Sequence, residues 1–237
     1  MCGRYILTTD AHTLGRLFDA AVRAELEPRY NIAPSQPVPV VRVSLDTKRR
    51  TLDLLHWGLI PHWADDPKIG YRMINARSES AAKKPAYRAA LRYRRCILPC
   101  DGFYEWNKLE SGGKQPHLIR MQDQSPFALA GLWEHWQDPE GNEIDSCTIL
   151  TTEPNDLVRE IHDRMPAILP REAVDAWLDP DRQDPAELTP LLRPLPAERM
   201  AAVPVSTRVN SPKNEGPACI APITDESNDP PEQGELF

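Results

Sequence analysis

Short segments in which apolar and polar residues alternate occupy the middle of the chain. Alternation of this kind is typical of half-buried strands, and here it is bounded by the turn sequences "ESGGKQ" and "DPEGNE". The pattern predicts an opening strand over residues 2–8 and extended or hairpin segments over residues 30–44 and 51–60. It predicts further strands over residues 95–106, 116–121, 127–136, 146–152 and 200–206.

A helical period replaces the alternation in a few places. Residues 11–26 put Leu14, Leu17 and Phe18 on one face, with Thr9 or Asp10 available as the N-cap. Short helices are also predicted over residues 85–94, 155–163 and 171–178. Residues 61–80 form a long polar stretch with aromatic side chains, which predicts a functional or mobile loop.

Length and proline content narrow the fold class. The chain has 237 residues, enough for one large domain, and its 25 prolines indicate many irregular connections between short elements. We therefore expect an α+β fold, with one domain over residues 2–223 built on an antiparallel or mixed, barrel-like β core with peripheral short helices. Residues 224–237 are acidic and poor in apolar side chains, so we expect a disordered tail.

The lengths of the apolar runs and the distribution of charge indicate whether the chain binds membranes or nucleic acids. No apolar run approaches the roughly 20 residues of a membrane span, and the first residues lack a secretory signal, so we expect a cytoplasmic, nucleoid-associated protein. The net charge is −7, yet residues 68–95 carry nine Lys and Arg against Glu79 alone, a local charge of +8. Such a run is often only a solvated face, but on one side of the fold it would neutralise phosphates.

The cysteines indicate reduced thiols. The chain has five, an odd number without a secretory signal, which argues against a disulfide framework. Cys96 and Cys100 lack the further ligands that would complete a zinc site, so no metal or other cofactor is expected.

Cys2 directly follows the initiator methionine. Aminopeptidases remove Met1 when the second residue is small, which would leave Cys2 with a free α-amine beside its thiol. With pKa values of about 8 and about 8.5, both groups are partly in their reactive forms at neutral pH. An aldehyde would form an imine with the amine, and attack by the thiol would close a thiazolidine ring. The simpler interpretation is that Cys2 only begins a strand.

Four other residues are candidates for chemistry, each with a simpler alternative. Asn75 and Arg77 would face the same side of an extended segment, although they could equally be a turn asparagine and a surface arginine. Burial of Glu105 among aromatic residues would raise its pKa toward the range useful for proton transfer, unless it merely pairs with an arginine. His162 is expected at a helix C-terminus, where the dipole favours imidazolium, although such histidines are commonly caps.

Eight sequence motifs occur in an order that resembles the SOS response-associated peptidase (SRAP) family of abasic site processing proteins. The likeness runs from Cys2 to about Ile223. The motifs are "MCGRY", "RYNIAPSQ", "WGLIPHWA", "INARSES", "CILPCDGFYEW", "ILTTEPN", "IHDRMP" and "VSTRVNSPKNEGPACI".

The resemblance implies an α+β domain, expected to be a monomer without a cofactor. It implies binding to single-stranded DNA that contains abasic sites, and a covalent crosslink to the ring-opened sugar. Under the resemblance, Cys2 is the nucleophile, Asn75 holds its surroundings, Glu105 handles protons and His162 helps to open the sugar. It also implies DNA contacts from Arg4, Arg77, Trp63 and Thr151.

Other activities remain open on the sequence. The imine intermediate would also permit strand cleavage by β-elimination, and any peptidase activity would be limited to removal of Met1. One alternative is an N-terminal nucleophile amidohydrolase resembling the glutamine amidotransferases, which would need an oxyanion site. A second is a DNA-binding module in which Cys2 is inert.

Overall fold

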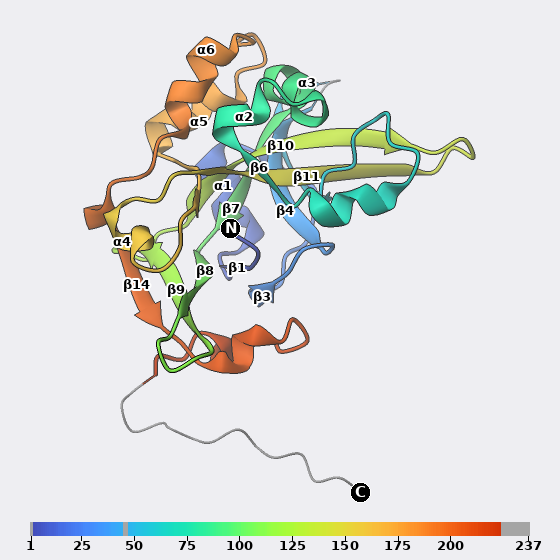
Figure 1. Ribbon diagram of the computed structural model, residues 1–237. Coiled ribbons are helices and arrows are strands. Elements are labelled where there is room, and N and C mark those ends of the chain that lie inside the picture. Colours follow the sequence, from blue (N-terminus) through green and yellow to red (C-terminus); the bar gives the residue numbers. More distant parts are fainter. Residues whose placement is uncertain (1, 45–46, 224–237) are drawn as a thin grey trace, which may run out of the picture.

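A five-stranded sheet contains the first strand of the protein. The computed structural model describes residues 2–44 and 47–223 (Figure 1), so the predicted acidic tail lies outside the described residues. The order in this sheet is β14 (Met200–Pro204), β9 (Lys114–Met121), β8 (Gly102–Lys108), β1 (Tyr5–Leu7) and β3 (Arg29–Ile32), with every neighbouring pair antiparallel.

The larger sheet is mixed and contains nine strands. Its path is β12 (Met165–Pro166), β11 (Glu143–Thr152), β10 (Phe127–Gln137), β7 (Arg95–Cys100), β4 (Pro37–Val43), β5 (Arg50–Trp57) and β2 (Ala21–Val22). Two short strands lie off this path: β13 (Ile168–Leu169) pairs with β10, and β6 (Asn75–Arg77) runs parallel to β11. The predicted α+β class with a barrel-like β core is confirmed.

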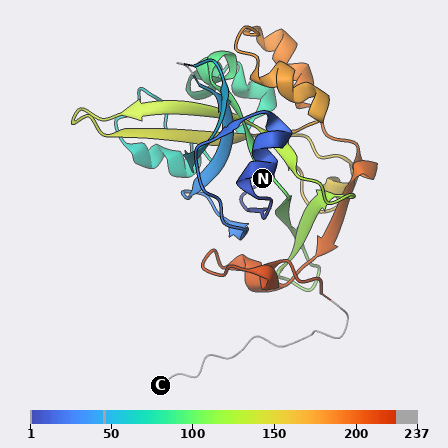
Figure 2. The same ribbon diagram turned by 180° about the vertical axis from the view of Figure 1, so that it is seen from behind.

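Short helices surround the strands. The α-helices are α1 (Ala11–Phe18), α2 (Ser78–Ala81), α3 (Pro85–Tyr93), α4 (Asp156–Arg159), α5 (Arg171–Leu178) and α6 (Pro185–Leu188). The 3-10 helices are η1 (Pro67–Arg72), η2 (Thr189–Leu192), η3 (Ala197–Arg199), η4 (Thr207–Asn210) and η5 (Pro217–Cys219). Viewed from behind, α1 crosses in front of the strands (Figure 2). No helix among the described residues is long and apolar enough to cross a membrane.

Three helix and loop predictions are corrected by the structure. The helix expected over residues 11–26 begins after the Asp10 cap but ends at Phe18, because Asp19 adopts a left-handed conformation (φ 49°) and β2 follows. The helix expected over residues 155–163 is only the four-residue α4. The predicted loop over residues 61–80 contains η1, β6 and the start of α2.

Close backbone contact fixes the approach to β6. A Cβ atom on Gly70 would lie 2.7 Å from the carbonyl oxygen of Gly58, and one on Gly58 would lie 2.6 Å from the oxygen of Gly70. Gly58 also has φ +139°, which favours glycine. These contacts hold η1 against the end of β5, immediately before the chain enters β6.

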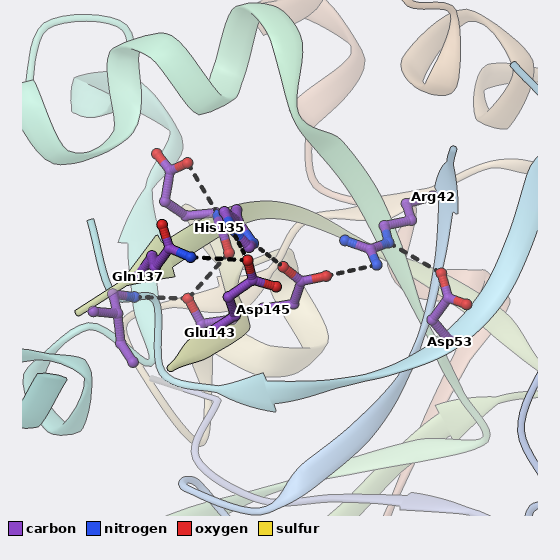
Figure 3. A network of polar contacts seen from close by, with 9 residues as sticks. Arg42, Asp53, His135, Gln137, Glu143 and Asp145 are labelled. Atoms are coloured by element: carbon purple, nitrogen blue, oxygen red, sulfur yellow. Dashed lines mark hydrogen bonds and ion pairs between the residues drawn. The ribbon is translucent and has the colours of Figure 1, made fainter. Parts of the chain in front are cut away.

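A network of charges joins four strands of the larger sheet (Figure 3). Arg42 in β4 binds Asp53 at 3.0 Å in β5 and Asp145 at 2.7 Å in β11, and its guanidinium lies 4.3 Å from the ring centroid of Trp133. His135 in β10 contacts the same Asp145 at 2.8 Å. The network therefore ties the turn-proximal part of the long β10–β11 hairpin to β4 and β5.

Asn31 anchors the C-terminal segment on the smaller sheet. Its Nδ2 lies 2.9 Å from the Ser211 oxygen and 2.7 Å from the Asn214 oxygen, and its Oδ1 accepts from Arg4 at 2.7 Å. The side chain is almost fully buried. Buried polar groups held in this way are costly to remove because their partners lose hydrogen bonds without gaining water.

We expect Asn31→Ala to lower the free energy of unfolding by about 2 to 3 kcal/mol, since several buried partners lose their bonds together. The measurement is urea unfolding followed by circular dichroism. Asn210→Ala is the matched control, because Asn210 is exposed and its Oδ1 accepts a hydrogen bond from the Trp106 indole. An equal loss in both variants would contradict an anchoring role for Asn31.

Candidate functional site

The pairing of β1 with β8 brings the start of the chain toward Glu105. Tyr5 lies opposite Phe103, and the Tyr104 amide donates to the Arg4 carbonyl at 2.9 Å. Cys2 is fully buried in the main apolar cluster. Burial, followed by the nearby Glu105 carboxylate, raises the pKa of the Cys2 thiol. In the chain that retains Met1, Cys2 is therefore held as the neutral thiol.

Asn75 reaches Cys2 from the larger sheet. It lies in β6, where its backbone is aligned with Ile149 of β11, and its Nδ2 donates to the Cys2 carbonyl at 2.7 Å. Its Oδ1 is buried, and no donor among the described residues reaches it. Asn75 thus fixes the backbone of Cys2 and leaves one acceptor available.

Glu105 is a buried carboxyl group beside this contact. Only 3% of the residue is exposed, and burial raises its pKa from an ordinary 4.5 to about 7. Near neutral pH both protonation states are populated, as a group that donates and accepts protons requires. The predicted burial of Glu105 is thus present in the structure.

His162 lies opposite Glu105 but is not at a helix end. Its Nε2 is 3.9 Å from Glu105 Oε2. Because α4 ends at Arg159, His162 lies in the turn that follows, and burial lowers its pKa. The expectation that a helix dipole favours imidazolium is wrong, since desolvation of the ring is the larger influence and acts in the opposite direction.

The four residues expected to carry chemistry form one contiguous group. Asn75 binds Cys2, the carboxylate of Glu105 acts on the Cys2 thiol, and His162 faces Glu105. They come from the chain start, β6, β8 and the turn after α4, so four distant segments assemble the site.

The residues expected to contact DNA are distributed differently. Arg77 is exposed and pairs in register with Thr151, which is buried with its Oγ1 3.5 Å from the Ala76 carbonyl. Trp63 is 51% exposed, whereas the other five tryptophans, all within the described part of the chain, are buried or half-buried.

Arg4 is bound within the protein. Its guanidinium donates to Asn31 Oδ1 and to the Val209 carbonyl, each at 2.7 Å, and lies 5.9 Å from the ring centroid of Trp106. These partners belong to or border the smaller apolar cluster, whereas Cys2 belongs to the main one. The contacts of Arg4 are those of a residue that holds the C-terminal segment.

The basic segment over residues 68–95 divides into two groups. Arg95 is buried and donates to backbone carbonyls that include those of Leu91 and Trp177, and Arg94 binds Glu134 at 2.7 Å. By contrast, the long cationic side chains on the outer face of α3 and just before it are exposed: Lys83, Lys84, Arg88 and Arg92. Together with Lys68, Arg72 and Arg77, which are also exposed, this second group is available to neutralise phosphates.

The sequence patterns gave no functional role to two residues near the site, Arg164 and Glu79. Arg164 forms a double ion pair with Glu79, at 2.8 and 2.9 Å, and follows His162 by two residues. The signal available in the sequence was that Glu79 is the single acidic residue in a strongly basic segment.

The pKa of Glu105 predicts how stability depends on pH. The folded state holds the proton more tightly than the unfolded chain, so the contribution of Glu105 is most favourable below pH 4.5 and is lost as the pH rises through about 7. The expected loss is about 3 kcal/mol. Urea unfolding at pH 5 and pH 8 should show a smaller decrease for Glu105→Gln than for the parent chain, and identical decreases would contradict the raised pKa.

Comparison with known proteins agrees with this arrangement of motifs and strands. The family model described as "SOS response associated peptidase (SRAP)" matches residues 1–212. Abasic site processing protein YoqW of Bacillus subtilis is 46% identical over 223 residues, covering 93% of this chain and 99% of the relative. Abasic site processing protein HMCES of Gallus gallus is 36% identical, covering 83% of this chain and 66% of its own.

Solved structures have the same fold. A protein from Bacteroides thetaiotaomicron superposes with a TM-score of 0.85 at 26% identity, covering 94% of this chain and all of that chain. A protein from Bordetella bronchiseptica gives 0.74 at 30% identity, covering 86% of this chain and all of that chain. The motifs, the site that they form and these similarities agree: the chain belongs to the SOS response associated peptidase (SRAP) family.

Proposed function

We propose that the chain, after losing Met1, captures abasic sites in single-stranded DNA as a thiazolidine crosslink through Cys2. The names of the relatives, abasic site processing proteins, support an abasic lesion as the substrate. The contact that carries the proposal is the hydrogen bond from Asn75 Nδ2 to the Cys2 carbonyl, beside the buried carboxyl of Glu105.

The reaction balances with one molecule of water released. The Cys2 amine adds to the aldehyde of the ring-opened sugar, and loss of water gives an imine. The thiol sulfur then adds to the imine carbon while the thiol proton passes to the nitrogen, which closes a five-membered ring. No oxidant, reductant or cofactor is needed. The same imine also opens a path to β-elimination, which ring closure suppresses.

Proton transfers in this sequence suit Glu105 and His162. Loss of water from the amine–aldehyde adduct needs an acid, and attack by the thiol needs a base. A carboxyl group with a pKa of about 7 can act first as the acid and then as the base. His162, across from Glu105 at 3.9 Å, is suited to protonate or deprotonate sugar oxygens during ring opening. The available Oδ1 of Asn75 is suited to accept a hydrogen bond from a sugar hydroxyl.

Imine formation makes the removal of Met1 a required step. Cleavage of the Met1–Cys2 bond converts the amide nitrogen of Cys2 into the free amine that adds to the aldehyde. Peptidase activity is limited in this proposal to that bond, and trimming by an aminopeptidase would serve equally well.

DNA contacts are assigned to Arg4, Arg77, Trp63 and Thr151. Exposed Arg77 is suited to a phosphate and exposed Trp63 to stacking on an unpaired base. Thr151, buried in β11 and in register with Arg77, is suited to support that residue. Arg4, already held by Asn31 and Val209, would act chiefly by holding the C-terminal segment in place.

A denaturing gel tests the central proposal. Matured protein mixed with a single-stranded oligonucleotide bearing one abasic site should give a covalent band, which should be absent for Cys2→Ala and for protein shown by mass spectrometry to retain Met1. Cys219→Ala is the control, because this buried thiol lies in the other apolar cluster. Noncovalent binding without a band in any sample would favour an inert DNA-binding module, and glutamine hydrolysis unaffected by the DNA would favour an amidohydrolase.

Arg77→Ala should weaken binding of undamaged single-stranded DNA and make its salt dependence shallower by about 0.7 in the slope of log affinity against log salt. The slope changes because the variant makes one phosphate contact fewer and therefore releases one counterion fewer on binding. Fluorescence anisotropy between 50 and 200 mM salt measures it. Arg193→Ala is the control, since Arg193 is exposed in the loop after η2. An equal change in both variants would remove Arg77 from the proposed interface.

A further inference from the structure

Glu79 is the single carboxylate in the basic segment 68–95, and it is held by Arg164. We propose that Glu79 and Arg164 are positioning residues, which hold the turn carrying His162 opposite Glu105. This inference rests on the proposed crosslinking function and assigns the pair a part in its proton transfers.

Arg164 is bound to two elements at once. Its guanidinium donates to both Glu79 oxygens in α2 and, at 2.7 Å, to the Thr151 carbonyl at the end of β11. Thr151 also pairs with Arg77 of β6, which directly precedes α2. A planar guanidinium held at three points has little rotational freedom, so the backbone of Arg164 is fixed with it.

The fixed backbone of Arg164 surrounds one nitrogen of His162. The Arg164 amide donates to His162 Nδ1 at 3.0 Å, and the Arg164 carbonyl lies 3.2 Å from the same atom. Asp163 Oδ1 lies 3.0 Å away on the same side. Neutral His162 accepts at Nδ1 from the amide, which leaves its proton on Nε2, whereas the imidazolium donates from Nδ1 to Asp163 or to the carbonyl.

The turn therefore accommodates both protonation states without moving the ring. In either state Nε2 carries a proton toward Glu105, at 3.9 Å from Oε2. Charged groups that act on His162 in the described chain are Glu105 across the site, Asp163 beside the ring and Lys114 of β9. Displacement of the turn would change the distance to Glu105 and the exposure of the ring together.

A purely electrostatic role of the Glu79–Arg164 pair predicts other effects of mutation than a positioning role does. Glu79 is 54% exposed, and exposed pairs usually contribute little to stability. If Glu79 acted only through its charge, its removal from a basic face would tighten DNA binding and leave the reaction rate unchanged. If it positions His162, its removal should slow the chemical step even when DNA is saturating.

The experiment measures single-turnover crosslinking of matured protein with a saturating abasic oligonucleotide from pH 5.5 to 8.5. Glu79→Ala and Arg164→Lys should each lower the rate about tenfold, since small misplacements of reacting groups are costly. The double variant should be no slower than the slower single variant, because both changes break one contact. DNA affinity should remain the same or become tighter in Glu79→Ala, and the pH profile should shift.

Glu79→Gln and Asp156→Ala complete the test. Glu79→Gln keeps one oxygen acceptor for Arg164 and should recover part of the rate. Asp156→Ala removes the exposed Asp156–Arg159 pair, also close before His162 in sequence, and should leave rate and pH profile unchanged. Unchanged rates in correctly folded Glu79→Ala would overturn the positioning role, whereas absence of a covalent band with the parent protein would overturn the crosslinking function itself.

Discussion

The alignment of β1 between β8 and β3 is the constraint on which the site depends. It directs the start of the chain into the interior, where Cys2 lies in the main apolar cluster beside the carboxyl of Glu105. A chain terminus is ordinarily among the most mobile parts of a protein. Here a strand paired on both sides fixes the segment that begins at Cys2, and Asn75 adds a hydrogen bond from the other sheet.

Burial acts in opposite directions on the acid and the base at this site. Loss of water disfavours the carboxylate and the imidazolium alike, so it raises the pKa of Glu105 and lowers that of His162. In water the ring would hold its proton to a higher pH than the carboxyl. In the fold this order is reversed, because the pKa of Glu105 rises to about 7 while that of His162 falls below its ordinary value of 6.5, so the carboxyl holds its proton to the higher pH.

The cationic side chains of residues 68–95 have different environments, although nearly all charges in this segment have the same sign. Arg95 donates to backbone carbonyls and Arg94 pairs with Glu134, both within the fold. Arg164, from another motif, pairs with Glu79. The exposed cations around α3 remain for an anionic partner. Net charge, at −7 for the whole chain, therefore says little about the local surface that DNA would meet.

Local patterns predicted most of the strands because alternation reports directly on a two-sided sheet. The predicted segments 95–106, 116–121, 127–136 and 146–152 became β7 with β8, β9, β10 and β11. Helix ends were predicted less well. After the left-handed turn at Asp19 the chain pairs as β2 with β5, and α4 lies near β14, so both helix ends adjoin elements that are distant in sequence.

The sequence by itself determined which residues can react: a cysteine at position two, an amide, a carboxyl and an imidazole in recognisable motifs. Only the tertiary structure decided how they act on one another, because proton affinity depends on burial and on neighbours that no local pattern records. The approach of His162 to Glu105, the internal bonds of Arg4 and the Glu79–Arg164 pair all join segments separated by many residues. Such contacts follow from how the sheets and connecting turns pack, which is a property of the whole chain.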